Sequence, residues 1–188
     1  MKTISKSIII CCSLFGSLQL HAANEIIITG RVIDSTCTLT GTVGTDSGSN
    51  NISVLLDTVP ASSFSGLNSV LATKAFTVQL TKSDGSACDS VTIAGLKGLN
   101  LVAGAGGYTN SSVLLNTAYT GTANRVNLQV LTDTDAPVTF NTVYPNQPRS
   151  AVNSTTGIIT YKAQYILSDT TAIAQDVQAT VNYTLEYN

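Results

Sequence analysis

Hydrophobic and polar residues alternate with a period of two in several short runs along the chain. The clearest run ends the sequence, and its apolar residues share one face: Ala179, Val181, Tyr183, Leu185 and Tyr187. Because successive side chains of a β-strand point to opposite faces, this pattern predicts a strand with one buried face. The same period predicts further strands at 76–80, 91–93, 125–131 and 159–165.

Clusters of Gly, Ser, Asn, Asp and Pro separate these runs and predict turns and loops. They occupy residues 41–51, 82–87, 104–112, 132–137 and 141–157. Helical periodicity is nearly absent. Short strands joined by polar turns, with no tryptophan, predict a single all-β domain built as an antiparallel Greek-key sandwich.

The first 22 residues have the plan of a secretory signal peptide. Lys2 and Lys6 give a positive start, residues 8–20 are largely apolar, and Ala22 supplies a small residue at the end. The apolar stretch is too short to span a bilayer. We expect cleavage after Ala22, with Ala23 as the alternative, and export of the rest of the chain.

Export changes the cysteine inventory. Cys11, Cys12 and His21, the only histidine, leave with the signal peptide, whereas Cys37 and Cys88 remain. Two cysteines in an exported chain favour a disulfide between them. Without histidine there is no ordinary zinc site and no Ser–His or Cys–His pair, so we expect no metal, no cofactor and no catalytic residue.

The charge pattern argues against nucleic acid as a partner. Loss of Lys2 and Lys6 leaves seven basic side chains against eleven acidic ones, a net charge near −4. The basic residues are scattered, and no stripe of them could follow a phosphate backbone.

The exported chain begins with another apolar strand, residues 23–34. Counting in twos from Gly30 places four residues on one face: Ile26, Ile28, Gly30 and Val32. The opposite register would bury Arg31 without a partner, which is costly, so we prefer the first. This segment is either an ordinary first strand of a self-contained sandwich or a strand offered to another molecule, as in β-strand addition.

Several segments, in this order, resemble type 1 fimbrial subunits, the family that builds chaperone–usher pili: residues 29–37, 75–80 ahead of Cys88, 124–133, 160–165 and 179–188. The resemblance implies an incomplete immunoglobulin-like Greek-key sandwich that is completed by a donor strand from a neighbouring subunit. It divides the chain into a signal peptide (1–22), an N-terminal donor strand (23–34) and a pilin domain (35–188).

The resemblance also implies the partners and the route to the cell surface. A periplasmic chaperone would first fill the gap in the sandwich, and an outer-membrane usher would exchange it for the arm of the next subunit in a homopolymer. The edge shared by these partners would be formed by the C-terminal strand: Ala179, Val181, Tyr183, Leu185, Tyr187 and the carboxylate of Asn188. The chain departs from the family at Gln175, where many members have a glycine, and in a longer spacing between Cys37 and Cys88.

The expected function is therefore a structural, non-enzymatic subunit of a fimbrium, in the first place the major shaft subunit. A minor adapter or terminator subunit is the alternative within the family. A secreted carbohydrate-binding β-sandwich is the alternative outside it, although such modules usually present aromatic platforms and this chain has no tryptophan.

Overall fold

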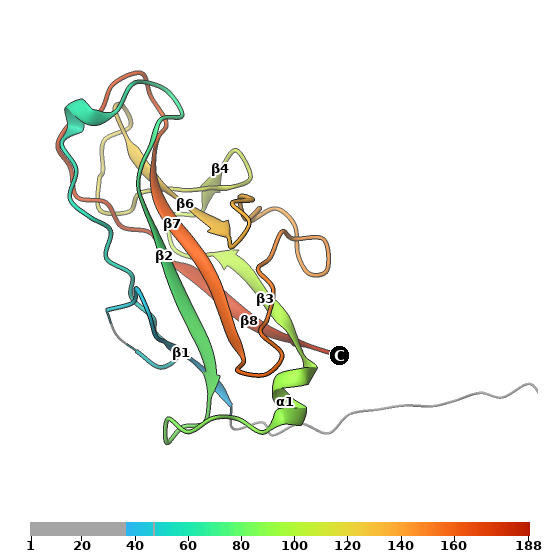
Figure 1. The fold of residues 1–188 in the computed structure, drawn as a ribbon. Helices are drawn as coiled ribbons and strands as arrows, with labels where there is room; N and C mark the ends of the chain where they lie inside the picture. The colour runs from blue at the N-terminus through green and yellow to red at the C-terminus, as the bar shows by residue number, and fades with distance from the viewer. Residues whose placement is uncertain (1–36, 47) are drawn as a thin grey trace, which may run out of the picture. The chain divides into compact units, whose positions relative to one another are not determined.

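The computed structural model describes residues 37–46 and 48–188, which form eight strands and two short helical segments (Figure 1). The strands are β1 (Thr38–Gly41), β2 (Val70–Thr81), β3 (Leu96–Ala103), β4 (Tyr108–Thr109), β5 (Val113–Leu114), β6 (Val126–Thr132), β7 (Ile158–Leu167) and β8 (Val181–Tyr187). The helical segments are the 3-10 turn η1 (Ala61–Ser63) and the helix α1 (Ser90–Gly95). The predicted signal peptide and donor strand, residues 1–34, lie outside the described residues, and so do Ile26, Ile28, Gly30 and Val32.

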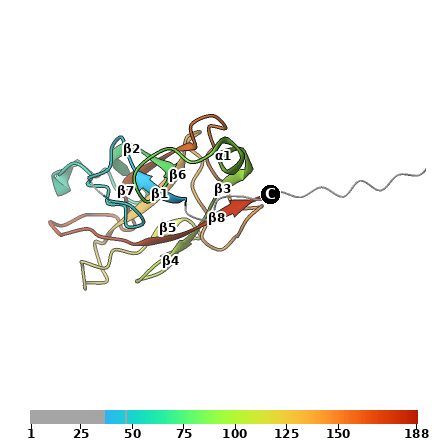
Figure 2. The same cartoon turned by 90° about the horizontal axis from the view of Figure 1, so that it is seen from below.

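The strands form two sheets. The larger sheet has six strands in the order β1-β2-β7-β6-β5-β4, and the smaller one pairs β3 with β8; all pairings are antiparallel. Figure 2, a view turned by 90°, shows β3 and β8 in a different layer from β2 and β7. The two layers enclose the core.

The strand order identifies the fold. In a seven-stranded immunoglobulin domain, strands A, B, E and D form one sheet and C, F and G form the other. Taken in chain order, β1, β2, β3, β6, β7 and β8 occupy the places of A to F, because β1-β2-β7-β6 repeats the order ABED and β3-β8 repeats CF. Within residues 37–188, no strand takes the place of G beside β8. The predicted fold class, an incomplete immunoglobulin-like Greek-key sandwich, is confirmed.

Alternating apolar residues fill the space between the sheets, as the sequence predicted. Leu80 of β2, Ile159 and Tyr161 of β7, and Leu39 of β1 are almost completely buried. They belong to one cluster that also takes in Leu99 of β3. Among the described residues, no helix is long and apolar enough to cross a membrane.

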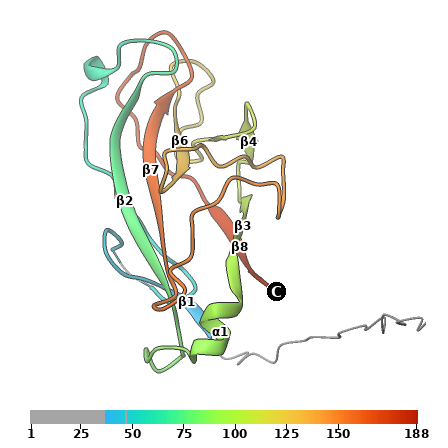
Figure 3. The same ribbon diagram turned by 45° about the vertical axis from the view of Figure 1, so that its right-hand side comes forward.

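The strand predicted at 91–93 is wrong: these residues lie in α1. Asp89 caps the helix, because its side chain accepts hydrogen bonds from the backbone N–H groups of Val91 (3.0 Å) and Thr92 (2.9 Å). Such a cap satisfies N–H groups that have no partner within a helix. Figure 3 shows α1 continuing directly into β3, which positions β3 opposite the larger sheet.

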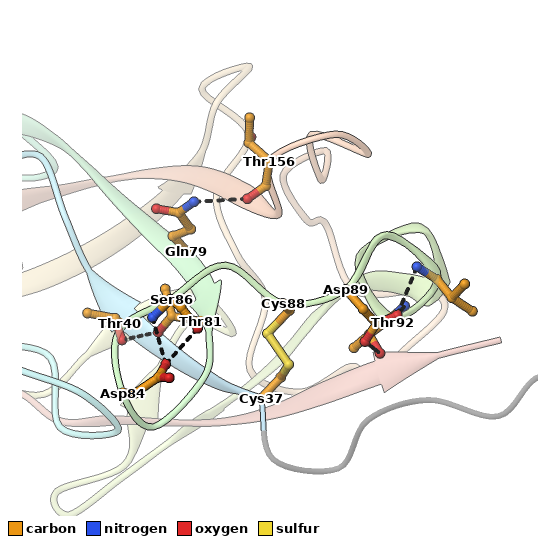
Figure 4. The surroundings of a disulfide bond; sticks show 11 residues. Cys37, Thr40, Gln79, Thr81, Asp84, Ser86, Cys88, Asp89, Thr92 and Thr156 are labelled. Carbon is orange, nitrogen blue, oxygen red and sulfur yellow. Dashed lines mark hydrogen bonds between the residues drawn. A yellow bond between two sulfur atoms is a disulfide. The ribbon is translucent and has the colours of Figure 1, made fainter.

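Cys37 and Cys88 form a disulfide, which confirms the predicted pairing. Their Cα atoms are 6.2 Å apart, and both residues are buried. Figure 4 shows that the bond joins the start of β1 to the segment just before Asp89 and α1. It therefore fastens the first strand of the large sheet to the segment that leads into the small one.

Replacing Cys88 with serine is expected to lower the free energy of unfolding by about 4 kcal/mol, because the disulfide closes a long loop of 51 residues in the unfolded chain. Denaturant unfolding of the purified protein measures this loss. Intact mass before and after reduction checks the oxidised state, and two free thiols in the folded, exported protein would contradict the assignment.

Candidate functional site

A groove of about 1140 Å³ opens between the two sheets beside β8, on the side where no strand of residues 37–188 takes the place of G. One wall is the segment 50–56, which follows β1, and the other is the segment 176–183, which leads into β8. Its floor is largely apolar and comes from both sheets: Leu39, Val78, Leu101, Leu114, Val130 and Tyr161. A groove with apolar side chains below and two extended segments as walls has the shape that a β-strand would fill.

The wall at 50–56 is held from its outer side. The backbone N–H of Leu55 donates to the Asp46 carboxylate (2.6 Å), and the backbone N–H of Asp46 donates to the carbonyl of Ser53 (2.8 Å). Lys74 of β2 donates to the carbonyl of Leu55 (2.7 Å). Leu55 itself is 70% exposed, so this wall presents an uncovered apolar side chain beside the groove.

The wall at 176–183 is held through its even-numbered residues. The carbonyl of Thr180 accepts from the backbone N–H of Gly104 (2.8 Å), and the carbonyl of Gln178 accepts from the backbone N–H of Thr117 (2.8 Å). At the far end of β8, the backbone N–H of Asn188 donates to the carbonyl of Gly95 (3.1 Å). Every second residue of this segment therefore directs its backbone groups away from the groove.

The odd-numbered residues complete the alternation. In an antiparallel pair, hydrogen-bonded and non-hydrogen-bonded residues alternate along each strand. Since the even residues bond outward, the odd residues direct their N–H and C=O groups toward the groove: Val177, Ala179, Val181, Tyr183 and Leu185. This free edge of β8 is the edge on which strand G would pair.

The apolar face of β8 contacts the core but is incompletely covered. Ala179, Val181, Tyr183, Leu185 and Tyr187 pack against the buried cluster, yet each is only half-buried. Their placement on one face agrees with the sequence pattern. An apolar strand face left half-exposed at an open edge is a site that another strand or protein would cover.

One contact links the two walls. The Tyr183 hydroxyl donates a hydrogen bond to the backbone carbonyl of Asn50 across the end of the groove (3.4 Å). The distance is long for an O–H···O bond, so the link is weak. A strand entering the groove at this end would displace it at small cost.

Several tyrosines around the groove have raised pKa values. Burial raises the pKa of Tyr161, in the floor, from 10.0 to about 12. Burial also raises the pKa of Tyr183, and for Tyr165 burial acts together with the negative charge of Asp57. These residues therefore favour the neutral phenol in the folded protein.

Alkaline pH should destabilise the folded protein. Folding raises the pKa of Tyr161 from 10.0 to about 12. The stabilisation of the folded state by the neutral Tyr161 is therefore fully present below pH 10 and is lost as the pH rises toward 12. The loss should reach about 2–3 kcal/mol in the free energy of unfolding. Urea unfolding across this pH range measures it, with Tyr161→Phe as the control; equal pH slopes for both proteins would contradict the assignment.

Buried amides beside the second wall were missed by sequence reasoning. Asn116 and Asn127 are 2% and 1% exposed. From the sequence, a polar residue between strands and a polar residue on one face of a strand would both be expected to face the solvent. The Gln175 side chain accepts from the backbone N–H of Val126 (3.1 Å) and donates to the carbonyl of Asn124 (2.8 Å). The departure from the family at Gln175 was the one signal in the sequence that pointed to this cluster.

No family model matches the chain, but comparisons with known proteins find similar ones. The chain is 29% identical over 178 residues to an F17 fimbrial protein from Escherichia coli, covering 92% of this chain and 91% of the relative. The crystal structure of the P pilus rod subunit PapA superposes with a TM-score of 0.51 at 16% identity, covering 88% of this chain and 99% of PapA. A Burkholderia pseudomallei antigen and type I fimbria protein, BPSL1626, has a TM-score of 0.49 at 18% identity, covering 80% of this chain and 97% of that one.

Proposed function

We propose that this chain is a fimbrial subunit of the chaperone–usher type and that it polymerises by accepting the N-terminal strand of the next subunit in the groove beside β8; its similarity to an F17 fimbrial protein supports this. The observation that carries the proposal is that no described strand takes the place of G beside β8, which leaves a groove next to that edge. Donor-strand complementation between pilins is a known form of β-strand addition, in which backbone hydrogen bonds give affinity and alternate side chains fill pockets.

The donor is the segment 23–34 of the neighbouring subunit. Its face made of Ile26, Ile28, Gly30 and Val32 would lie on the apolar floor of the groove, since only one face of a strand can point inward. Gly30 would allow the donor backbone to approach the walls closely, because it has no side chain to push them apart.

A periplasmic chaperone would occupy the same edge before assembly. It would pair with the strand from Ala179 to Tyr187, and basic residues of the chaperone would meet the carboxylate of Asn188. An outer-membrane usher would then exchange the chaperone for the incoming arm. The exported subunit would thus pass through the periplasm to the cell-surface fimbrium.

We place this chain in the shaft of the fimbrium. A chain that carries both a donor arm and an acceptor groove can bind copies of itself head to tail, and head-to-tail contacts that do not close into a ring make an open filament. This favours a homopolymer and the role of major subunit over that of an adapter or terminator.

Purified surface material tests the proposal. Gel electrophoresis in SDS without heating should show a ladder of oligomers that collapses to the monomer after boiling in acid, and this chain should make up most of the protein by mass spectrometry. A single monomer band without heating would contradict strand exchange. A ladder in which this chain is a trace component would overturn the shaft role alone.

A further inference from the structure

The buried side chain of Asn116 contacts the groove wall at two adjacent backbone groups. Its Nδ2 donates to the carbonyl of Asp176 (2.8 Å), and its Oδ1 accepts from the backbone N–H of Gln178 (3.0 Å). These two groups flank Val177 on the outward edge of the wall. A single side-chain amide therefore makes the pair of hydrogen bonds that the backbone of a neighbouring strand makes in a β-ladder.

Among the strands that the structure describes, none does this for the wall at Val177, because β3 does not reach it. The pairing of β3 with β8 ends at Ala103 and Val181, and one further hydrogen bond joins Gly104 to Thr180. Beyond that point the outward edge is held by Asn116 and by the Thr117–Gln178 bond. The wall is thus extended past the end of the small sheet by a side chain.

Asn116 is itself fixed on all sides. Its backbone N–H donates to the Asn127 side chain (2.9 Å), its Nδ2 also reaches the Gln175 side chain (3.2 Å), and its Oδ1 also accepts from the backbone N–H of Ala118 (2.9 Å). A buried amide whose groups are all paired has little freedom to turn, and loss of one partner would leave others unpaired. Asn116 is therefore placed to hold the wall in one register before any donor strand arrives.

We propose that Asn116 is a positioning residue that extends the receiving edge of the groove from β8 to Val177 and Ala179. Because the residues on either side of them form their hydrogen bonds away from the groove, Val177 and Ala179 direct their own N–H and C=O groups into it. The donor strand can therefore form backbone hydrogen bonds beyond the end of β8. This inference rests on the proposed function and adds to it the length of the acceptor edge.

Hydrogen exchange in fibres assembled from the full exported chain tests the proposal. In wild-type fibres, the backbone amides of Val177 and Ala179 should be protected, like those of Val181 and Tyr183. In Asn116→Ala fibres, protection of Val177 and Ala179 should fall roughly tenfold or more, because one or two hydrogen bonds of the wall are lost, while Val181 and Tyr183 keep theirs.

Asn100→Ala is the matched control. The Asn100 side chain accepts from the backbone N–H of Tyr144 (3.1 Å) and does not itself line the groove, although its neighbours Leu99 and Leu101 do, so its loss should leave all four amides protected. The wild-type measurement stands even if Asn116→Ala fails to assemble, because free exchange at Val177 and Ala179 in wild-type fibres overturns the proposal.

Two results separate this inference from the proposed function. If Val177 and Ala179 keep their protection in Asn116→Ala fibres, or if all four amides lose protection equally, Asn116 does not position the edge. If Val181 and Tyr183 exchange freely even in wild-type fibres, strand addition beside β8 fails as well.

Discussion

A synthetic peptide with the sequence of residues 23–34 is expected to raise the Tm of the subunit lacking this arm by tens of degrees. Without a donor, apolar residues of the β8 wall such as Val181 and Tyr183 stay half-exposed, and the Tyr183–Asn50 contact that joins the two walls is weak. Burying Ile26, Ile28 and Val32 would each stabilise the folded state by about 1.5–3 kcal/mol, because an apolar side chain is removed from water. Since each kcal/mol shifts the Tm of a domain of this size by about 2–4 °C, a shift of tens of degrees follows.

Thermal unfolding with saturating peptide measures this shift, which should grow with peptide concentration because the ligand binds only the folded state. The same peptide with Gly30→Leu is the control, and it should insert slowly or incompletely since its side chain would separate the two backbones. If the wild-type peptide leaves the Tm unchanged, the sandwich is stable without a donor strand, and residues 23–34 are an ordinary first strand.

Deleting residues 23–28 is expected to abolish fibre extension while leaving chaperone binding intact. The deletion removes Ile26 and Ile28 from the donor face but leaves the groove and the β8 edge unchanged. Electron microscopy of the surface and co-purification of the subunit with its chaperone measure the two outcomes. Pili of normal length on the deletion strain would contradict this prediction.

Single substitutions in the run of three isoleucines test the register of the donor. Ile28→Ser should shorten or remove the fibres, because it places a hydroxyl on the apolar floor. Ile27→Ser, which changes the outward face by the same chemistry, should assemble as the wild type does. The reverse result would show that the opposite face of the arm is inserted.

Strands with a regular period of two could be predicted from the sequence. β2 and β7 contain the predicted segments, while β6 and β8 begin one and two residues after the predicted starts at 125 and 179, because the alternating residues of all four fill the core between two sheets. β3 was not foreseen: its pairing with β8 shifts between Leu96 and Gly98, and Gly98 has a φ of +138°, so the alternation is broken within the strand. A bulge of this kind changes which residues face inward, so the strand has no regular alternation of apolar and polar residues in the sequence.

The helix α1 was mistaken for a strand because it is too short to show a helical period. Six residues make less than two turns, and Val91 and Ile93 alternate with polar or small neighbours as they would in a strand. The signal that could have found it is Asp89 followed by Thr92, since the Thr92 hydroxyl also donates to the Asp89 carboxylate (2.6 Å).

The groove could be anticipated only in part. The apolar face of β8 was predicted, but the opposite wall, at 50–56, follows a polar loop and shows no strand pattern of its own. The amide cluster could not be predicted, because the Asn116 side chain bonds Gln175 and Asp176, which are 59 and 60 residues further along the chain. Contacts of that separation are set by the assembled sandwich rather than by local sequence.

Electron cryomicroscopy of the assembled fibre tests the central claim most directly. The account predicts a strand between the segment 50–56 and the edge of β8 in every subunit, traceable as residues 23–34 of the adjacent subunit, with Ile26, Ile28 and Val32 on the groove floor. A groove filled by the arm of the same chain, or left without a strand in the fibre, would contradict it.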